Sequence, residues 1–388
     1  MIERLLAQKL LALAQKFPVI TVTGPRQSGK TTLVRATFPT LPYVSLEEPD
    51  IRQLALTDPR GFLANFGDGA VLDEVQRAPD LFSYIQSIVD SNRNAQFILS
   101  GSSNFLLMER VGQTLAGRSA VLHLLPFSLP ELENGRFPLT TYEQILFNGQ
   151  YPRIYDRQIA PTDFYPSCIQ TYVERDVRLL KNIADLNAFI RFTKLCAGRT
   201  GQLLNYNSLA NDADISPNTV KAWLSVLEAS YITYRLYPYH KNFNKRLVKS
   251  PKLYFYDTGL ACSLLGIREV EQVNTHFLRG ALFENLIINE FIKRGLNRGE
   301  RNYPYFWQDN SGKEIDCLLE NQGVLTPIEI KSNKTMVTNH FKNINYWRRL
   351  TGVDDGGGAV VYGGDSSMHT SDGQFVSWKD LGQIGTLA

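Results

Sequence analysis

The first third of the chain alternates short apolar runs with polar and helix-forming stretches. The runs VITVT at 19–23, AVLD at 70–73 and QFILS at 96–100 carry few polar residues, and each leads into a polar segment. Runs of this length that are apolar at nearly every position are typical of parallel strands buried in a sheet. The preceding residues LLAQKLLALAQKF have the spacing of an amphipathic helix. The pattern therefore predicts an α/β domain built on a parallel sheet.

The middle of the chain has the apolar spacing of helices. In TDFYPSCIQTYVERDVRLL the apolar positions recur every three or four residues, at Ile169, Tyr172, Val173, Val177 and Leu180. This spacing predicts a small helical subdomain after the α/β domain.

Two capped helices are predicted next, in the stretch LNYNSLANDADISPNTVKAWLSVLEA. Ser216 is the expected N-cap of the second helix, and Pro217 stands at the first helical position, where its missing N–H is tolerated. The residues expected to bury one face of this helix-turn-helix are Leu209, Ile215, Val220, Leu224 and Leu227. The residues expected on the outer face, where a recognition helix touches DNA, are Asn218, Thr219 and Lys221. With ITYRLYPY and KLYFYD as wing strands, the segment predicts a winged helix, which either contacts DNA or serves as an interaction module.

The last third combines one apolar helix with three strands. The helix LIINEFIKR starts near Leu282-Phe283-Glu284-Asn285, and PYFWQ, KEIDCLLE and LTPIEIKS are the predicted strands. Residues two apart on a strand point to the same face, so Glu329 and Lys331 are expected side by side.

Length and composition agree with a folded chain of several domains. The chain has 388 residues, of which 43% are hydrophobic and 11% aromatic, more apolar material than disordered chains contain. We expect an α/β domain over 1–150, a helical and winged-helix domain over 151–260, and a second α/β domain over 261–388. Four scattered cysteines without a CxxC pair argue against a zinc knuckle and for a reducing, cytoplasmic location. No window is long and apolar enough to span a membrane, so no membrane partner is expected.

The strongest chemical signal follows the first predicted strand. Residues 24–31, GPRQSGKT, satisfy G-x-x-x-x-G-K-[ST] between a strand and a helix. Backbone N–H groups of such a loop cradle phosphates, Lys30 would neutralise the β- and γ-phosphates, and Thr31 would coordinate Mg²⁺. The residues expected to bind ATP are Gly24, Pro25, Arg26, Gln27, Ser28, Gly29, Lys30, Thr31 and Thr32.

Polar residues end the next two strands, where open α/β sheets bind ligands. Asp73 is the expected partner of Mg²⁺, and Glu74 is the expected base that orients the attacking water. In SGSSN, Ser102 is favoured over Ser100, Ser103 and Asn104 as the group that reaches the γ-phosphate or the water. Arg118 either acts on a neighbouring subunit's γ-phosphate as an arginine finger or pairs with a local carboxylate.

These motifs together resemble the prokaryotic AAA-type P-loop ATPases that carry a C-terminal domain of unknown function. The resemblance rests on GPRQ-x-GKTTL, LDEVQ, L-x-GSS and LAGR, and it extends over nearly the whole chain. It implies an AAA+ core, and it implies assembly into a homo-oligomeric ring, with a hexamer expected.

The last third also carries a constellation of acidic residues. Asp316 and Glu329 on neighbouring strands would hold Mg²⁺ or Mn²⁺, Glu284 would add a further ligand, and Lys331 would stabilise charge on a phosphodiester. The set resembles the active site of the PD-(D/E)xK nuclease fold, including its order of one helix and three strands. The proline of that motif is absent, since Glu314-Ile315 precedes Asp316. An E-x-K at the end of a strand is also common as a surface ion pair.

Charge is concentrated in the middle of the chain. Residues 151–250 carry 14 Lys and Arg against 8 Asp and Glu, and HKNFNKRLVKSPK contains Lys241, Lys245, Arg246, Lys249 and Lys252. A basic stretch with aromatic neighbours is suited to a phosphate backbone, although it also occurs as a solvated loop.

Two functions remain open from the sequence. The first is an ATP-hydrolysing machine that binds DNA, including branched or single-stranded DNA, and processes it with a metal-dependent nuclease. The second is an ATP-dependent switch or scaffold whose nuclease-like fold is inactive and binds a protein or nucleic acid. A site blocked by another side chain would favour the second.

Overall fold

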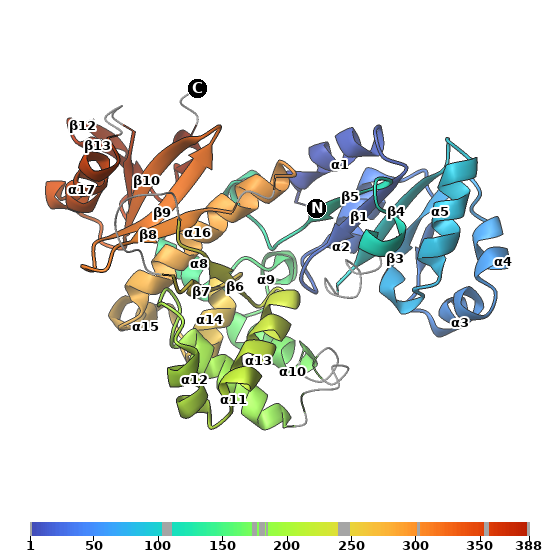
Figure 1. The fold of residues 1–388 in the computed structure, drawn as a ribbon, viewed down its shortest axis with the longest axis horizontal. Helices are drawn as coiled ribbons and strands as arrows, with labels where there is room; N and C mark the ends of the chain where they lie inside the picture. Colours follow the sequence, from blue (N-terminus) through green and yellow to red (C-terminus); the bar gives the residue numbers. More distant parts are fainter. Residues whose placement is uncertain are drawn as a thin grey trace.

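The chain folds into three parts, seen in Figure 1 as an α/β part, a helical part and a second sheet. The computed structural model describes residues 2–102, 111–172, 177, 183, 185–239, 249–300, 303–352 and 357–385. The basic residues Lys241, Lys245 and Arg246, like Ser103 and Asn104, lie outside this range.

The α/β part contains a five-stranded sheet in the order β2-β3-β4-β1-β5, and all of its strand pairs are parallel. Every residue of two strands is buried: Val19–Thr23, which precedes the loop at 24–29, and Gly69–Asp73, which ends at the acidic pair Asp73 and Glu74. The predicted parallel sheet is therefore confirmed. Its strands are β1 (Val19–Thr23), β2 (Tyr43–Ser45), β3 (Gly69–Asp73), β4 (Gln96–Gly101) and β5 (Ser119–His123).

Helices cover both faces of this sheet. On one face, Leu6, Leu33 and Val34 pack against Ile20 and Ile98. On the other face, apolar residues of three further helices pack against the remaining strand residues. The helices of the first face are α1 (Leu6–Ala14) and α2 (Lys30–Thr37). Those of the second are α3 (Pro49–Thr57), α4 (Pro59–Ala64) and α5 (Leu81–Ser91), and the short η1 (Val75–Arg77) follows β3.

The middle part is mostly helical, as predicted. Ser216 caps α13, since its hydroxyl accepts a hydrogen bond from the Thr219 N–H at 3.1 Å, and Leu209, Val220 and Leu224 are buried. A two-stranded antiparallel hairpin follows this helix pair. The elements are α7 (Leu129–Asn134), α8 (Tyr142–Asn148), α9 (Pro152–Asp156), α10 (Pro161–Tyr172), α11 (Leu186–Ala197), α12 (Tyr206–Ala213), α13 (Pro217–Ala229), β6 (Thr233–Leu236), β7 (Lys252–Phe255), α14 (Thr258–Leu264) and α15 (Val270–Thr275).

The C-terminal part is a mixed six-stranded sheet in the order β12-β13-β11-β10-β9-β8. The helix α16 packs its apolar side into the core shared with the middle part, and α17 packs Ile344 and Trp347 on the opposite side. All three predicted strands are present. The elements are α16 (Arg279–Asn297), β8 (Tyr305–Gln308), β9 (Glu314–Asn321), β10 (Val324–Lys331), η3 (Thr338–Phe341), α17 (Lys342–Thr351), β11 (Ala359–Tyr362), β12 (Met368–Thr370), β13 (Gly373–Ser377) and η4 (Leu381–Gln383).

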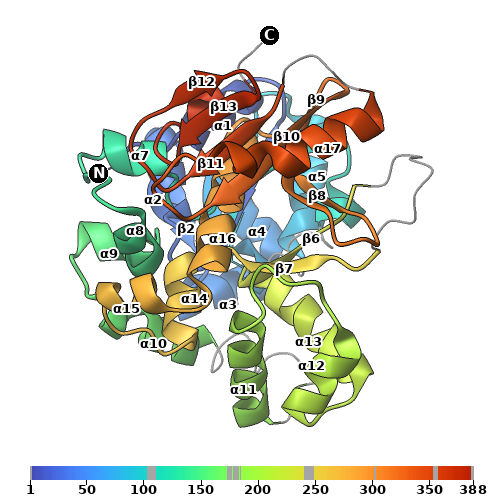
Figure 2. The ribbon, with the colours of Figure 1, turned by 90° about the vertical axis from the view of Figure 1, so that its left-hand side faces the viewer.

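One helix touches all three parts. The 19-residue α16 contacts β10 of the C-terminal sheet, α8 and α14 of the middle part, and α1 and β5 of the α/β part. In Figure 2 it runs through the centre of the molecule, below the C-terminal sheet. A movement of α16 would therefore reach all three parts.

Candidate functional site

The loop between β1 and α2 has a backbone that only certain residues can adopt. Gly24 has φ 152°, and a Cβ added there would lie 2.1 Å from the Leu124 carbonyl oxygen. Gly29, at φ 93°, is the N-cap of α2, and Gln27 also has a positive φ of 62°. These angles turn the loop back over the start of α2, where backbone N–H groups and the helix dipole favour an anion.

The side chains of the loop are arranged for a polar ligand. Lys30 is buried, and its ammonium group donates to the carbonyl oxygens of Gly24 and Pro25 at 3.0 and 2.7 Å. The Ser28 hydroxyl and the Gln27 Oε1 are buried, and neither has a hydrogen-bond partner among the described residues. Buried polar atoms without partners are uncommon and destabilising. The loop therefore fits a phosphate group, whose oxygens could accept from the Ser28 hydroxyl, whereas the Gln27 Oε1 is an acceptor and needs a donor.

Asp73, at the end of β3, lies beside the loop. Its Oδ2 accepts hydrogen bonds from the Thr31 hydroxyl at 2.6 Å and the Tyr43 hydroxyl at 3.0 Å. Its Oδ1 accepts from the Ser100 hydroxyl at 2.5 Å. Burial and the Asp73 carboxylate raise the pKa of Tyr43 to about 12, so the phenol stays a donor. Thr31 and Asp73 thus lie together as a Mg²⁺ site requires, and Ser100 bonds to Asp73 instead of extending toward a phosphate.

Glu74 is held in an unusual conformation directly after this strand. Its φ is 54°, a left-handed conformation that non-glycine residues seldom adopt and that is often found at functional sites. The Ser102 hydroxyl and the Gln76 amide both donate to Glu74 Oε2, at 3.2 and 2.5 Å. Ser102, expected at the γ-phosphate or the water, is thus in contact with the candidate base. Gln76 closes the LDEVQ motif, but its side chain had no expected role.

A cavity of about 630 Å³ adjoins the loop. Gly29 and Thr32 line it on the loop side, and Phe127 and Pro152 contribute from the segment after the sheet. Arg4, also on its wall, donates to the Ser28 carbonyl oxygen at 2.7 Å. A largely apolar cavity next to a phosphate-binding loop has the size and lining to hold the base of a nucleotide.

Arg118 lies at the opposite edge of the sheet. It immediately precedes β5, whose first residue pairs with Val19 at the start of β1, whereas the loop follows the end of β1. Its guanidinium donates two hydrogen bonds to Asp90, at 2.6 and 2.9 Å. Of the two roles expected for Arg118, the pairing with a local carboxylate is therefore present within one subunit. An arginine finger acts on the neighbouring subunit, and for that role Arg118 stays a prediction.

The expected residues of the second site come together where β9 and β10 separate. The pairing of these strands ends at Ile328, and the Ile330 N–H then donates to the Asp316 carboxylate at 2.7 Å. The Lys331 ammonium lies 3.0 Å from Asp316 and 2.6 Å from Glu329. The same-face prediction for Glu329 and Lys331 agrees with this contact.

A lysine from the middle part enters the same site. Lys252, the first residue of β7, is 4% exposed, and its ammonium contacts Glu284 at 3.1 Å and also Glu314. Carboxylate oxygens of Glu284, Glu314 and Asp316 all lie within 4.8 Å of one another, a spacing that could hold a metal ion. The acid that joins Glu284 and Asp316 in this group is thus Glu314, which was not an expected ligand. The expected ligand Glu329 is instead paired with Lys331. The Lys252 ammonium occupies the position between two of these acids.

The backbone of β7 is fixed where it meets α16. The Asn285 amide donates to the Phe255 carbonyl oxygen at 2.7 Å, and its oxygen accepts from the Phe255 N–H at 3.0 Å. Asn289 donates to the same carbonyl at 2.9 Å. Because these amides are buried, they hold β7, and with it Lys252, against the acidic site.

The buried acids differ in their affinity for protons. Burial and the neighbouring Asp316 raise the pKa of Glu329 to about 8, against the opposing effect of Lys331. Burial likewise raises the pKa of Glu284 to about 6. Burial also acts on Asp316, but the Lys331 and Lys252 ammonium groups outweigh it and hold the pKa of Asp316 below its usual value.

We expect the free energy of unfolding to fall as the pH rises from about 5 to 8. Between the ordinary glutamate pKa of 4.5 and about 8, folded Glu329 binds a proton that the unfolded chain has lost. Urea unfolding at pH 5, 6, 7 and 8 measures this slope, which Glu329→Gln should reduce. Glu320→Gln, at the exposed end of β9, is the matched control. An unchanged slope in Glu329→Gln would contradict the raised pKa.

The proposed DNA-contacting residues are accessible. Asn218 and Lys221 of α13 are exposed and Thr219 is half-buried, while Lys249 is exposed at the start of the segment leading to β7. The Lys221 ammonium lies 5.6 Å from the centre of the Tyr206 ring. DNA binding by this face remains a prediction.

Three family models match successive parts of the chain. Residues 16–133 match an AAA domain, residues 139–271 a domain of unknown function (DUF8612), and residues 279–381 another (DUF4143). Uncharacterized proteins of Mycobacterium bovis and Mycobacterium tuberculosis are each 29% identical to the chain over 336 residues, 85% of this chain and 74% of theirs. An uncharacterized protein of Methanocaldococcus jannaschii is 22% identical over 300 residues, 64% of this chain and 63% of its own.

The chain has a distant similarity to two solved structures from Pyrococcus species. A Walker-type ATPase of Pyrococcus abyssi is 16% identical with a TM-score of 0.47, over 68% of this chain and 96% of that one. A signal transduction ATPase with numerous domains, from Pyrococcus horikoshii, is 11% identical with a TM-score of 0.28, over 75% and 46%. Among the described residues, no helix has the length and apolarity to cross a membrane. The N-terminal part of the chain is a P-loop ATPase domain of the AAA type, because residues 16–133 match an AAA domain and the loop before α2 has the geometry of a phosphate-binding loop.

Proposed function

We propose that the chain is a Mg²⁺-dependent ATPase whose nucleotide cycle switches the middle and C-terminal parts on DNA. The observation that carries the ATPase is the contact of Thr31 with Asp73 beside a loop whose buried Ser28 hydroxyl has no partner among the described residues. Bound Mg²⁺ would neutralise charge on the β- and γ-phosphates. Lys30 would turn from its own loop carbonyls to the phosphates, and Glu74 would accept a proton from the attacking water.

A route of hydrogen bonds supports the switch. Arg4 donates to the Ser28 carbonyl of the loop and, at 3.0 Å, to Glu131 of α7. The Leu129 N–H at the start of α7 donates to Glu290 of α16 at 2.7 Å. All of these groups are buried, where hydrogen bonds are strong and costly to break. A nucleotide that moves the loop would therefore act on α16.

The same helix carries Glu284 in the acidic site. Glu284 and Glu290 lie six positions apart on α16, so the helix joins the loop network to the Lys252 contact. Lys252 blocks the cluster in this conformation, which favours the switch over a permanently active nuclease. We therefore propose that the nuclease-like centre is closed in this conformation. If it never opens, the chain is the inactive scaffold.

Metal-dependent DNA processing is the second candidate, and the proximity of Asp316, Glu329 and Lys331 favours it. Labelled duplex, single-stranded and branched DNA, incubated with Mg²⁺ or Mn²⁺ with and without ATP, tests it directly. Cleavage lost in Asp316→Ala would establish a nuclease. Cleavage that survives Asp316→Ala combined with Glu329→Ala would come from another site. Absence of cleavage on every substrate would leave the switch.

DNA affinity should weaken steeply with salt, because phosphates neutralised by lysines release counterions. Removing charge with Lys221→Gln and Lys249→Gln should weaken binding to every sequence alike and lower the salt slope by about one per lost contact. Fluorescence anisotropy of labelled DNA measures both quantities, and Lys16→Gln, exposed beside α1, is the control. Equal losses in the control would show that the middle part is not the DNA-binding surface.

Assembly in a ring would bring Arg118 to a neighbouring active site, since a head-to-tail interface that closes gives a ring. We expect a hexamer with an ATP analogue and Mg²⁺, measured by light scattering. Arg118→Ala should lower ATP turnover by about 10³-fold, as loss of an arginine finger does. Arg93→Ala, exposed after α5, is the control. A strict monomer would remove Arg118 from the site.

A further inference from the structure

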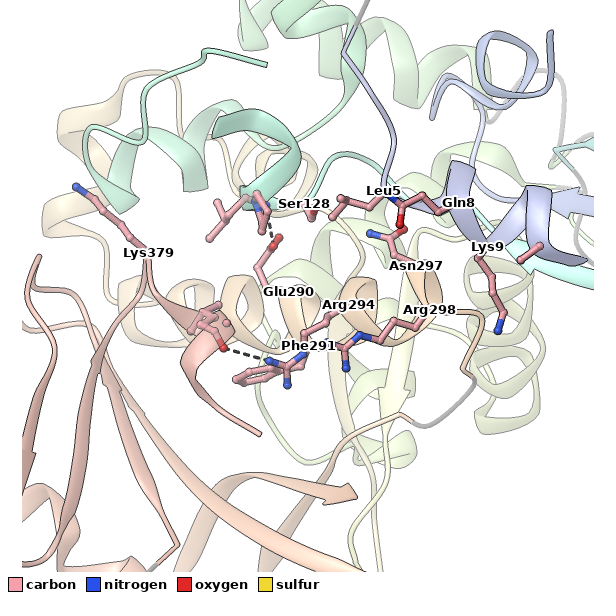
Figure 3. A pocket seen from close by; sticks show the side chains of 15 residues that line it. Leu5, Gln8, Lys9, Ser128, Glu290, Phe291, Arg294, Asn297, Arg298 and Lys379 are labelled. Atoms are coloured by element: carbon pink, nitrogen blue, oxygen red, sulfur yellow. Dashed lines mark hydrogen bonds between the residues drawn. The ribbon is translucent and has the colours of Figure 1, made fainter. Parts of the chain in front are cut away.

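A second cavity lies on the other side of α1 from the nucleotide loop. It has a volume of about 520 Å³ and is lined by α1, the start of α7, the last turns of α16 and the segment of η4. Figure 3 shows Leu5, just before α1, and Gln8 of α1 facing Asn297, with Arg294 and Arg298 extending from α16. Four segments far apart in sequence thus line it, and its volume is within the size range of small-molecule sites.

The charge in this cavity is mainly positive. Lys9, Arg294 and Arg298 line it, and none of the three forms an ion pair with another described residue. Lys379, at its far end, is paired with Asp365 at 2.8 Å. Three cations that share one cavity and are not paired with a carboxylate repel one another unless an anion joins them.

The one acid on the wall is already neutralised. Glu290 Oε2 accepts from the Leu129 N–H, and its Oε1 accepts from the Gln150 amide at 2.8 Å and the Lys293 ammonium at 3.1 Å. Both oxygens therefore already have partners, and the Lys293 ammonium, which does not line the cavity, supplies the opposite charge. Glu290 does not balance the charge of the three cations.

Arg294 is held in place without an anion. Its Nη1 donates to the carbonyl oxygens of Leu381 and Ile384 at 3.1 and 2.8 Å, and the guanidinium lies 5.2 Å from the centre of the Phe291 ring. Burial and the nearby Arg298 lower the pKa of Arg294. A cation near the end of a helix is often a solvated cap of its own carbonyls. Arg294 instead bonds the carbonyls of another segment and is half-buried in the cavity wall.

We propose that this cavity binds a small organic anion with one negatively charged head and an apolar body. Arg294, Arg298 and Lys9 would hold the head, since arginines bind carboxylate, sulfonate or phosphate oxygens in pairs. Leu5, Leu129 and other apolar residues of the wall would cover the body. Ligand sites commonly combine such an apolar lining with a few convergent polar groups.

The position suggests what the ligand would do. Arg4, Ala7 and Leu11 line the cavity beside the nucleotide loop, whereas Gln8 and Ala12 line this one. One helix thus forms a wall of both cavities. A ligand here would contact the helix that also lines the cavity beside the nucleotide loop, and a link between the two sites is the one step that rests on the proposed ATPase function.

The probe is 8-anilinonaphthalene-1-sulfonate, which carries a sulfonate on an apolar body, titrated into the full chain and followed by its fluorescence. N-phenyl-1-naphthylamine, which lacks the sulfonate, is the matched neutral ligand. We expect saturable binding of the sulfonate about tenfold tighter than that of the neutral amine, because charge-assisted hydrogen bonds hold the head. The double variant Lys9→Gln, Arg298→Gln should lose about tenfold in affinity for the sulfonate and little for the amine.

The control is the double variant Lys16→Gln, Arg93→Gln, which removes the same charge at exposed positions outside the cavity. Retained affinity in the control and lost affinity in the cavity variant support the site. Four outcomes would overturn it: no saturable binding, equal affinity for the two dyes, full affinity in the cavity variant, or an equal loss in the control. None of these readouts depends on ATP hydrolysis, so the site is tested separately from the ATPase.

Discussion

Glu74→Gln should leave nucleotide binding intact and lower ATP turnover by about 10²–10⁴-fold, the usual contribution of a general base. The amide keeps the size of the side chain and an oxygen that can accept from Ser102, so the loop geometry should persist. Only the ability to accept a proton from water is lost. Phosphate release measures turnover, and a fluorescent ATP analogue measures binding.

Lys30→Ala should show the reverse division of effects. It removes the charge that the loop holds next to its phosphate-binding backbone, so affinity for ATP should fall by about 10–100-fold, as for the loss of a charge-assisted hydrogen bond.

The control for Glu74→Gln is Glu47→Gln, an amide substitution at an exposed acid that pairs with Arg77 at 3.5 Å. Turnover at the native rate in Glu74→Gln would show that Glu74 is not the base.

The α/β part could be predicted closely because its signals are local. The strands β1 and β3 are short, mainly apolar runs, and the loop motif joins one of them to a helix within eight residues. Ser216 and Pro217 marked the start of α13 for a similar reason, since capping acts within one turn. Where the determinant spans a few residues, the sequence is sufficient.

The contacts that complete each site are not local, and the sequence pattern carries no sign of them. Tyr43 reaches Asp73 from a neighbouring strand 30 positions away. Arg4, which ties the loop to α7, lies 127 positions from Glu131. Such pairs form because the sheet and helices bring distant segments together, and a single sequence does not record that.

Lys252 is the clearest example. In the sequence it is one lysine of a basic stretch suited to DNA, yet it lies buried among acids 32 and 62 positions away. Its neighbours Leu253, Tyr254 and Phe255 are buried too, which fixes β7 in the core and turns Lys252 inward. A buried charge needs partners, and Glu284 and Glu314 supply them.

Lys252→Met should therefore have a large effect on stability. The substitution keeps an unbranched side chain but leaves Glu284 and Glu314 without their cation, and breaking a buried ion pair costs about 3–5 kcal/mol. Thermal unfolding measures the loss. Lys334→Met is the control, because Lys334 pairs with Glu143 at 3.4 Å from an exposed position.

The same variant should gain affinity for a divalent cation. With the ammonium removed, the oxygens of Glu284, Glu314 and Asp316, all within 4.8 Å of one another, are open to Mn²⁺, which prefers carboxylate ligands. Mn²⁺ should restore much of the lost stability of Lys252→Met and do little for the native chain, because an ion that binds only the folded state stabilises it. Electron paramagnetic resonance counts the bound Mn²⁺, and an excess of ADP accounts for ions held at the nucleotide loop.

The two results together decide whether Lys252 closes the site. Native protein that binds Mn²⁺ at the acidic cluster as tightly as Lys252→Met, with binding lost in Asp316→Asn, would mean that Lys252 does not block a cation. A variant that is destabilised and gains no Mn²⁺ would mean that the acids serve only to hold β7 against α16. Metal binding confined to Lys252→Met would identify Lys252 as the group that must leave before the C-terminal centre can bind a cation.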